Sequence, residues 1–185
     1  MPKKGFDDIR FSDENSYICA SRDNVSCMEK ANIVTNILVC SYNELTEEQK
    51  KLVDCAKEAS TRAYAPYSCF SVGAAALLDN GEIIEGSNQE NAAYPSGICA
   101  ERTTLFYAGA RYPDSAVRKL AIAAMKDGAY IALPTAPCGA CRQVILETEN
   151  RYDSPIEILL YGEEKTYIVS SIKELLPLSF GKDNL

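Results

Sequence analysis

The chain has 185 residues, of which 46% are hydrophobic, and it carries a net charge of −7 with no histidine. This length and apolar content predict one globular domain with a substantial core. The missing histidine excludes Ser-His-Asp and Cys-His catalysis, so any acid–base group must be a carboxylate, Cys, Lys, Tyr or metal-bound water. Positive charges are dispersed, and no apolar run is long enough for a membrane span. We therefore expect a small uncharged substrate, and neither nucleic acid nor membrane as a partner.

The N-terminal part of the chain differs in composition from the rest. Residues 1–30 are polar, of mixed charge and without a regular hydrophobic period, so we expect a poorly ordered tail there. Residues 31–185 are expected to form the single working domain. Met28 stays open as an alternative start of the chain. The apolar stretch at residues 33–39 predicts a strand.

The next segment contains a well-marked helix start. Thr46 is followed three residues later by Gln49, which is the spacing of a capping box. Apolar residues then recur at helical spacing up to Ala59. We expect this helix to end before Pro66, because proline disfavours a helical conformation in the residue before it.

Buried strands and helices then alternate to the end of the chain. Asp79-Asn80-Gly81 predicts a tight hairpin turn between the first two of these strands. The predicted strands are residues 70–78, 83–84, 120–125, 156–161 and 167–169, and the predicted helices are residues 98–110, 139–150 and a short last one at 172–176. Strands that alternate with helices indicate an α/β sandwich.

Three of the eight cysteines stand at predicted helix starts. Cys99 is followed two residues later by Glu101, and Cys138 forms a Cys-x-x-Cys pair with Cys141. Zinc binds thiolates tetrahedrally, and a catalytic site has three protein ligands and leaves the fourth position to water. The helix dipole favours thiolate over thiol at these positions. The pattern therefore predicts one Zn²⁺ per chain, held by the three thiolates, with Glu101 handling protons beside it.

Other readings of the cysteines stay open. A lone Cys-x-x-Cys pair is often a redox site or half of a structural zinc site. A structural four-cysteine site would take its fourth ligand from the remaining cysteines, which are Cys19, Cys27, Cys40, Cys55 and Cys69. We expect Cys55 and Cys69 to be small buried apolar residues instead. Free thiols that bind metal imply a reducing compartment, so we expect a cytoplasmic protein.

Four segments resemble the cytidine deaminase family, in its small, three-cysteine, homotetrameric branch. They are YAPYSCFSVGAA at residues 64–75, GSNQENAAYPSGICAERT at 86–103, PCGACRQ at 137–143 and ELLP at 174–177. The combination of a ligand-x-Glu pair with Pro-Cys-x-x-Cys is the signature of zinc deaminases. The resemblance runs in order from about residue 44 to residue 180 and leaves out the tail.

The resemblance implies a fold and an activity. The implied fold is a three-layer α/β/α sandwich around a mixed five-stranded sheet. The implied reaction is the hydrolytic removal of the 4-amino group of cytidine and 2′-deoxycytidine, which gives uridine and 2′-deoxyuridine with release of ammonia and serves pyrimidine salvage.

The resemblance also implies roles for particular residues. Cys99, Cys138 and Cys141 match the zinc ligands, and Glu101 matches the proton shuttle. Arg102 and Gln143 match residues that donate hydrogen bonds to ligand sulfurs and offset their charge. The matches to substrate-binding residues are Phe70, which forms an aromatic wall of the nucleobase pocket, Asn88 and Glu90, which bind the ribose 3′-hydroxyl, and Ala100. Tyr94 and Phe180 match residues that reach into the sites of neighbouring subunits of the tetramer.

Several alternatives remain at this point. Another deaminase of the same fold, acting on an aminonucleoside antibiotic such as blasticidin S, shares the cysteine motifs. An RNA- or DNA-editing deaminase needs a positively charged channel, which the acidic balance disfavours. A zinc-stabilised binding module without catalysis leaves Glu101 unexplained. Each residue with an implied role also has a purely structural alternative. Arg102 could be a solvated residue on a helix surface, and residues 88–90 could form a polar turn. Phe70 could be a core aromatic, and Phe180 could pack on the core of its own chain.

Overall fold

The computed structural model describes residues 30–185. The chain divides into the segment Met1–Thr35 and a compact unit Asn36–Leu185, to which all helices and strands named below belong. The predicted tail lies, apart from Lys30, outside the described residues, and the domain boundary at residue 31 stays a prediction. Among the described helices, none has the length and apolar character needed to cross a bilayer.

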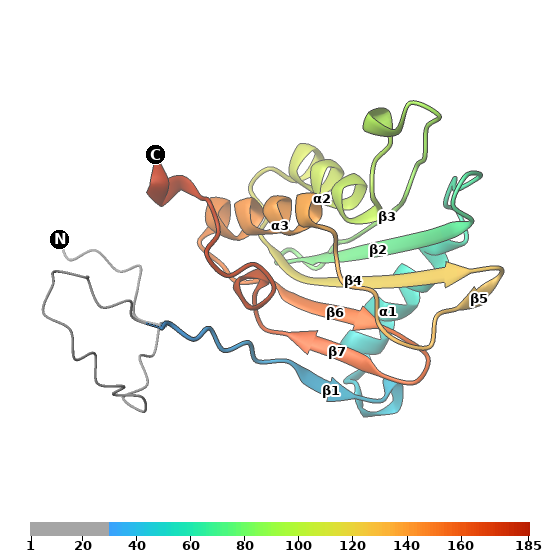
Figure 1. Cartoon of the computed structure of the whole chain (residues 1–185), viewed down its shortest axis with the longest axis horizontal. Coiled ribbons are helices and arrows are strands. Elements are labelled where there is room, and N and C mark those ends of the chain that lie inside the picture. Colours follow the sequence, from blue (N-terminus) through green and yellow to red (C-terminus); the bar gives the residue numbers. More distant parts are fainter. Residues whose placement is uncertain (1–29) are drawn as a thin grey trace, which may run out of the picture. The chain divides into compact units, whose positions relative to one another are not determined.

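Strands and helices alternate through the compact unit, as expected from the sequence (Figure 1). The α-helices are α1 (Glu47–Ser60), α2 (Ala100–Arg111) and α3 (Gly139–Tyr152). The strands are β1 (Leu38–Cys40), β2 (Phe70–Leu78), β3 (Ile83–Ser87), β4 (Val117–Lys126), β5 (Ala129–Tyr130), β6 (Glu157–Tyr161) and β7 (Thr166–Val169).

The strands form one mixed sheet of seven strands in the order β1-β7-β6-β4-β2-β3, with β5 paired to β4. Strands β4 and β6 run parallel, and the other pairs are antiparallel. The α/β class and the mixed sheet are confirmed, but the expected number of five strands is wrong. The two additional strands, β1 and β5, have three and two residues and extend the sheet by antiparallel pairing.

Helix α1 begins where the capping box predicts. The Thr46 hydroxyl accepts a hydrogen bond from Gln49 N at 3.3 Å, and Gln49 Oε1 accepts one from Thr46 N at 3.0 Å. The helix ends at Ser60, before Pro66. It packs so closely on β2 that a Cβ on Gly73 would lie 2.0 Å from Ala56 O, so only glycine fits there.

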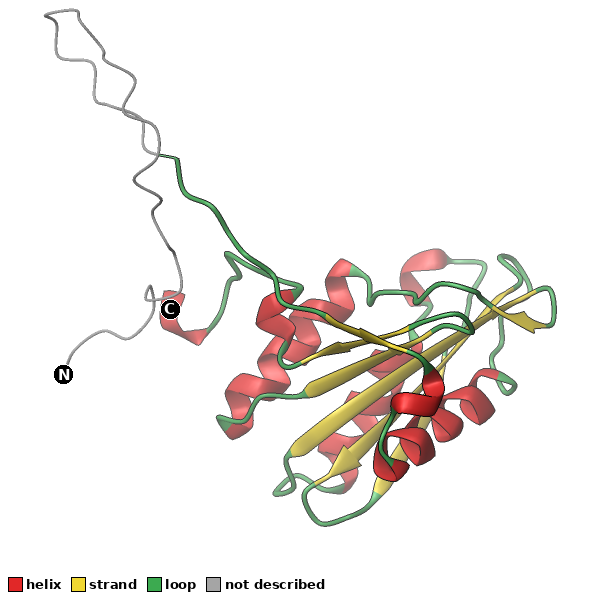
Figure 2. Ribbon diagram, turned by 90° about the horizontal axis from the view of Figure 1, so that it is seen from below, coloured by secondary structure: helices red, strands yellow, loops and turns green. Residues whose placement is uncertain are grey.

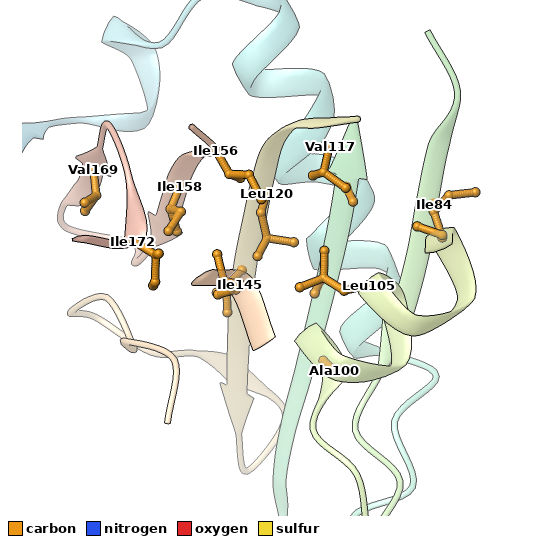
Figure 3. Packing of buried hydrophobic residues seen from close by; sticks show 14 of the residues in the cluster. Ile84, Ala100, Leu105, Val117, Leu120, Ile145, Ile156, Ile158, Val169 and Ile172 are labelled. Carbon is orange, nitrogen blue, oxygen red and sulfur yellow. The ribbon is translucent and has the colours of Figure 1, made fainter. Parts of the chain in front are cut away.

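Helix α1 covers one face of the sheet, and α2 and α3 cover the other (Figure 2). Side chains along β2 point alternately to the two faces of the sheet. Ala74, Ala76 and Leu78 face α2 and α3. Ala75 and Leu77 face α1. Figure 3 shows the larger core on the α2 and α3 side, where Leu105 and Ile145 meet sheet residues such as Leu120. The three layers therefore fix the starts of α2 and α3 on the same side of the sheet.

The last predicted helix is shorter and tighter than expected. It is a 3₁₀ turn over Ile172–Glu174. The buried Glu149 carboxylate, near the end of α3, accepts hydrogen bonds from Ile172 N at 3.0 Å and from the Ser171 hydroxyl at 2.9 Å. The same carboxylate accepts a hydrogen bond from Ile156 N at 2.9 Å. This side chain ties the C-terminal segment to α3 and to the start of β6.

Candidate active site

Three thiols converge where α2 and α3 begin, and we call Cys99, Cys138 and Cys141 together the thiol group. Cys99 is the N-cap residue of α2, Cys138 is the N-cap residue of α3, and Cys141 lies buried in the first turn of α3. The Cys99 and Cys138 sulfurs are 3.8 Å apart, and the Cys138 and Cys141 sulfurs are 3.4 Å apart. All three sulfurs lie within 4.8 Å of one another. The fold thus joins cysteines that are far apart in the sequence.

This spacing fits a zinc ion. Tetrahedral bonds of about 2.3 Å from zinc to sulfur place the ligand sulfurs about 3.8 Å apart. The two separations of 3.8 and 3.4 Å are close to that value. The three cysteines are free thiols, and three protein ligands leave one position of a tetrahedron open. The donor set therefore suits a catalytic zinc site, and it could also hold another thiophilic metal.

The pKa values of two of the three thiols are shifted in opposite directions. The pKa of the Cys99 thiol is lowered to about 5, first by a hydrogen bond from the Cys141 thiol and then by the Arg102 guanidinium. The pKa of Cys141 is raised, because its thiol donates to Cys99 and because it is buried. One thiolate is thus stabilised, while the proton on its neighbour is held in place. A bound divalent cation would favour loss of that proton too.

Glu101 lies in the first turn of α2 and is 4% exposed. Burial raises the pKa of its carboxyl group, and the negative charge of Cys99 adds to this rise. A raised pKa favours a carboxyl group that can both accept and release protons. The sequence-based prediction of a proton-handling residue rests on the spacing, because Glu101 lies two residues after Cys99.

Arg102, the next residue, directs its guanidinium to the thiol group. Its Nη2 lies 3.7 Å from the Cys99 sulfur, and this contact raises the pKa of Arg102. Within the described part of the chain, its Nε is buried without a hydrogen-bond partner. The residue is therefore not the solvated surface arginine of the alternative reading. Its position suits a group that offsets thiolate charge.

Gln143 contacts the C-terminal segment, because its Nε2 donates a hydrogen bond to Phe180 O at 2.9 Å. The amide nitrogen has a second hydrogen, and a bond from it to a ligand sulfur stays a prediction. The preceding residue, Arg142, donates from Nε to Pro137 O at 2.8 Å and from Nη1 to Leu175 O at 2.6 Å. Sequence reasoning missed Arg142. It lies in the quoted PCGACRQ motif, but nothing local identifies an acceptor such as Leu175 O, which is 33 residues away.

The two residues assigned to the ribose lie on an extended segment beside Cys99. Gln89, between them, exchanges two backbone hydrogen bonds of 2.9 Å with Ile98. The Asn88 amide bonds the start of β2, accepting from Val72 N at 2.7 Å and donating to Phe70 O at 3.0 Å. One amide hydrogen and one lone pair remain on Asn88 for a ligand.

The Glu90 carboxylate holds the loop before β2. It accepts hydrogen bonds from Tyr67 N at 2.9 Å, from Ser68 N at 3.3 Å and from the Ser68 hydroxyl at 2.5 Å. These bonds lower the pKa of Glu90, the Ser68 hydroxyl having the largest effect, so the group is a carboxylate at neutral pH. Ser68 was not predicted as a site residue, although it lies within the first resembling segment. A sequence alone does not show that it meets Glu90.

The residues expected to contact the base and neighbouring subunits differ in exposure. Phe70 is partly buried at the start of β2, and Ala100 is fully buried at the start of α2. Tyr94 is 76% exposed and meets the Tyr67 ring edge to face at 6.3 Å. Phe180 is 60% exposed, so its side chain is not packed into the core of its own chain.

The expectation for Cys69 is wrong. Cys69 is exposed, and its φ of 54° places it in the left-handed region. Directly after this residue, Phe70 N, at the start of β2, donates a hydrogen bond to the Ser68 hydroxyl at 3.0 Å. Cys55 is partly buried, on the face of α1 that packs on the sheet.

With this geometry established, the chain can be compared with known proteins. Residues 46–152, more than half of the chain, match the family described as the cytidine and deoxycytidylate deaminase zinc-binding region. This range contains all three cysteines of the thiol group and Glu101. The resemblance found in the sequence and the prediction of a zinc-binding region are confirmed.

Individual relatives agree with this match. A cytidine deaminase of Sporosarcina psychrophila is 40% identical over 139 residues, which cover 74% of this chain and 93% of that protein. The crystal structure of cytidine deaminase from Burkholderia pseudomallei is 37% identical, with a TM-score of 0.61, over 74% of this chain and 100% of that one. The cytidine deaminase structure from Mycobacterium tuberculosis is 31% identical, with a TM-score of 0.58 over 74% and 99%. The chain therefore belongs to the cytidine deaminase family of zinc-dependent hydrolases.

Proposed function

We propose that this chain is a cytidine deaminase that hydrolyses the 4-amino group of cytidine and 2′-deoxycytidine, giving uridine and 2′-deoxyuridine and releasing ammonia. The observation that carries the proposal is the three-thiol group with the buried Glu101 beside it, inside the range that matches the family. Relatives named cytidine deaminase share 37–40% of their residues with this chain over most of their own length.

In this proposal, Cys99, Cys138 and Cys141 hold one zinc ion per chain. When bound, zinc supplies a Lewis acid and lowers the pKa of a water molecule. Three thiolates place three negative charges on a divalent ion and weaken its Lewis acidity. Arg102, whose Nη2 lies 3.7 Å from the Cys99 sulfur, offsets part of that charge.

Glu101 moves the protons of the reaction. Its carboxylate takes one proton from the attacking water as the water oxygen bonds to C4, and passes it to N3 of the pyrimidine ring. It then takes the second proton from the C4 hydroxyl and delivers it to the amine. The C4–N bond breaks, ammonia departs and the C4 carbonyl of the product forms. Burial supports this role, because it raises the pKa of the Glu101 carboxyl and so favours a group that can carry protons between these steps.

The substrate is held by groups around the thiol site. Asn88 and Glu90 bind the ribose 3′-hydroxyl, for which Glu90 supplies a charged acceptor and Asn88 one free donor and one free acceptor. Phe70 forms a wall for the base, and Ala100 lines the site at the start of α2. Ser68 fixes the Glu90 carboxylate by its 2.5 Å hydrogen bond.

We further propose a homotetramer in which Tyr94 and Phe180 complete the sites of neighbouring chains. Both rings are largely exposed in the single chain, which supports a role outside it. We place the enzyme in the cytoplasm, because its proposed function needs cysteine ligands that stay reduced.

The decisive experiment is to incubate the purified protein with cytidine and follow the loss of ultraviolet absorbance. Blasticidin S and a short cytosine-containing oligonucleotide are tested in parallel. We expect turnover of cytidine and none of the other two compounds. Turnover of blasticidin S without turnover of cytidine would assign the site to antibiotic deamination, and a reaction on the oligonucleotide alone would assign it to editing.

A further inference from the structure

The Arg142 side chain joins two parts of the molecule that the proposed mechanism uses separately. Its Nε donates to Pro137 O at 2.8 Å, directly before the thiol residue Cys138. Its Nη1 donates to Leu175 O at 2.6 Å, in the C-terminal segment that carries Phe180. A planar guanidinium with donors in a fixed fork can hold two carbonyl groups in one geometry. The carbonyl groups before Cys138 and at Leu175 are therefore fixed relative to each other.

The C-terminal segment after Leu176 has little packing of its own. Leu178 is 80% exposed and Phe180 is 60% exposed, so hydrophobic burial does not hold these residues. Leu178 also has a φ of 55°, a left-handed conformation that costs energy for a leucine. A segment with few buried side chains and an unfavourable backbone conformation depends on its hydrogen bonds for its position.

Three side-chain hydrogen bonds connect the C-terminal segment to α3. Besides Arg142, the Gln143 amide donates to Phe180 O at 2.9 Å, and Lys182 Nζ donates to Asn150 O at 3.2 Å. Arg142 and Gln143 directly follow Cys141 in the sequence. Arg142 differs from the other two side chains because it also bonds the turn that precedes Cys138.

We propose that Arg142 is a positioning residue that holds the C-terminal segment on α3 and so sets the place of Phe180, the ring that completes the site of a neighbouring chain in the proposed tetramer. It acts through the carbonyls of Pro137 and Leu175 and touches neither substrate nor metal. The inference rests on the proposed function in one respect, which is that Phe180 covers the pyrimidine of a bound nucleoside. Loss of Arg142 then weakens substrate binding through Phe180 and leaves the three thiol ligands in place.

The first test measures the segment directly, with no need for activity. Hydrogen–deuterium exchange is followed for residues 176–181 in the zinc-loaded, full-length protein. Arg142→Ala should exchange faster there than the wild type, and its zinc content should stay near one per chain. Arg151→Ala is the matched control, because Arg151 lies on the same helix and donates to Pro113 O at 3.0 Å, away from the thiol group. Unchanged exchange at residues 176–181 in Arg142→Ala would overturn the proposal.

The second test is kinetic and uses a double-mutant cycle. Arg142→Ala should raise KM for cytidine by about 5- to 150-fold, the range that loss of a base–aromatic contact gives, with a smaller change in kcat. In a Phe180→Ala background, the same substitution should have little further effect on KM, because its route is already removed. Fully additive effects on KM would overturn the route through Phe180. If Arg142→Ala instead loses zinc and lowers kcat while KM is unchanged, Arg142 supports the metal ligands rather than Phe180, and the proposal is overturned.

A conservative variant protects the test against misfolding. Arg142→Lys keeps the positive charge, but an ammonium on a single stem does not reproduce the two-carbonyl fork. We expect faster exchange and a raised KM in Arg142→Lys, both smaller than in Arg142→Ala. Wild-type exchange and wild-type KM in Arg142→Lys would show that the positive charge alone suffices. That result would contradict the proposal that the guanidinium holds two carbonyl groups. If the wild type does not turn over cytidine, the proposed function fails, whereas the exchange experiment still decides the position of the segment.

Discussion

The thiol group and the aromatic residues assigned to the substrate differ in how far a single chain builds them. Cys141 is fully buried and Glu101 is 4% exposed, and both are fixed by the first turns of helices that pack on the sheet. Tyr94 is 76% exposed and Phe180 is 60% exposed, and both lie outside the regular helices and strands of the sandwich. The first region is complete within one chain, whereas the second offers apolar surface that nothing within the described residues covers.

This difference separates two kinds of sensitivity. Changes in the thiol group should abolish metal binding or chemistry whatever the state of assembly. Changes in the aromatic region should weaken substrate binding and should depend on which chains are assembled together. The following predictions test this separation, from the largest expected effect to the smallest.

The largest effect is expected from removing a thiol. Cys141→Ala should lose zinc and reduce activity below detection, because two thiolates do not complete the ligand set of a catalytic zinc site. Zinc per chain is measured after gel filtration, together with cytidine turnover. Cys55→Ala serves as the control, since Cys55 lies on α1, and it should keep both. Full zinc occupancy in Cys141→Ala would place the metal elsewhere.

Glu101→Gln should separate chemistry from metal binding. The variant should retain one zinc per chain and lose activity by about 10⁴-fold, since general acid–base groups contribute 10²–10⁴-fold and Glu101 serves several proton transfers. Metal analysis and steady-state kinetics on the same preparation check this. A rate within about tenfold of wild type lies below that range and would remove Glu101 from the mechanism.

The sugar contacts should give an intermediate effect. A hydrogen bond to a charged group contributes about 1.5–3 kcal/mol, so 3′-deoxycytidine should be a poorer substrate than cytidine by about 10- to 150-fold in kcat/KM. Free cytosine should be poorer still, and 2′-deoxycytidine should react nearly as well as cytidine. Competition assays measure the three ratios. Equal rates for cytosine and cytidine would contradict the assignment of Asn88 and Glu90.

Subunit mixing tests whether Phe180 serves a neighbouring chain. Phe180→Ala alone should raise KM by about 5- to 150-fold through loss of a base–aromatic contact. Glu101→Gln chains refolded together with Phe180→Ala chains should regain affinity, because some hybrid sites contain an intact pair. Light scattering measures the assembly in parallel. A stable monomer with wild-type kinetics would end the proposal of shared sites.

The smallest effect is expected on α1, away from both regions. The Lys57 ammonium lies 5.5, 4.9 and 4.7 Å from the ring centroids of Tyr42, Tyr130 and Tyr161. Lys57→Met should lower the free energy of unfolding by about 1 kcal/mol through loss of these contacts, and lower Tm by about 2–4 °C. Lys51→Met, at an exposed position of the same helix, is the control. Thermal unfolding measures both, and a change in cytidine turnover would be unexpected.

Local signals in the sequence predicted much of the fold. The capping box at Thr46 and the strand over residues 70–78 were found where the structure has them, because both depend on neighbouring residues. The strand expected at residues 33–39 was only partly right, since β1 covers Leu38–Cys40. Its pairing with β7, 126 residues further on, decides which residues are extended.

The candidate site shows the same limit. The sequence predicted the three cysteines and Glu101, because their spacing at helix starts is itself the chemical signal. It did not predict the contacts of Ser68 with Glu90, of Arg142 with Leu175 O, or of the Gln143 amide with Phe180 O. A hydrogen-bond donor contacts whichever acceptor the returning chain brings near, so its partner is not written in the local sequence.

The sequence by itself thus determined the α/β class, the starts of α1 and α3, the start of α2 to within two residues, and the residues with the chemistry of a zinc site. Periodicity, capping and motif spacing act over a few residues, and they are visible without the fold. Only the tertiary structure decided the number of strands and the exposure of Cys69. It also brought the Cys99 sulfur within 3.8 Å of Cys138. These features depend on packing between segments that lie far apart in the chain, where the same local pattern is compatible with several arrangements.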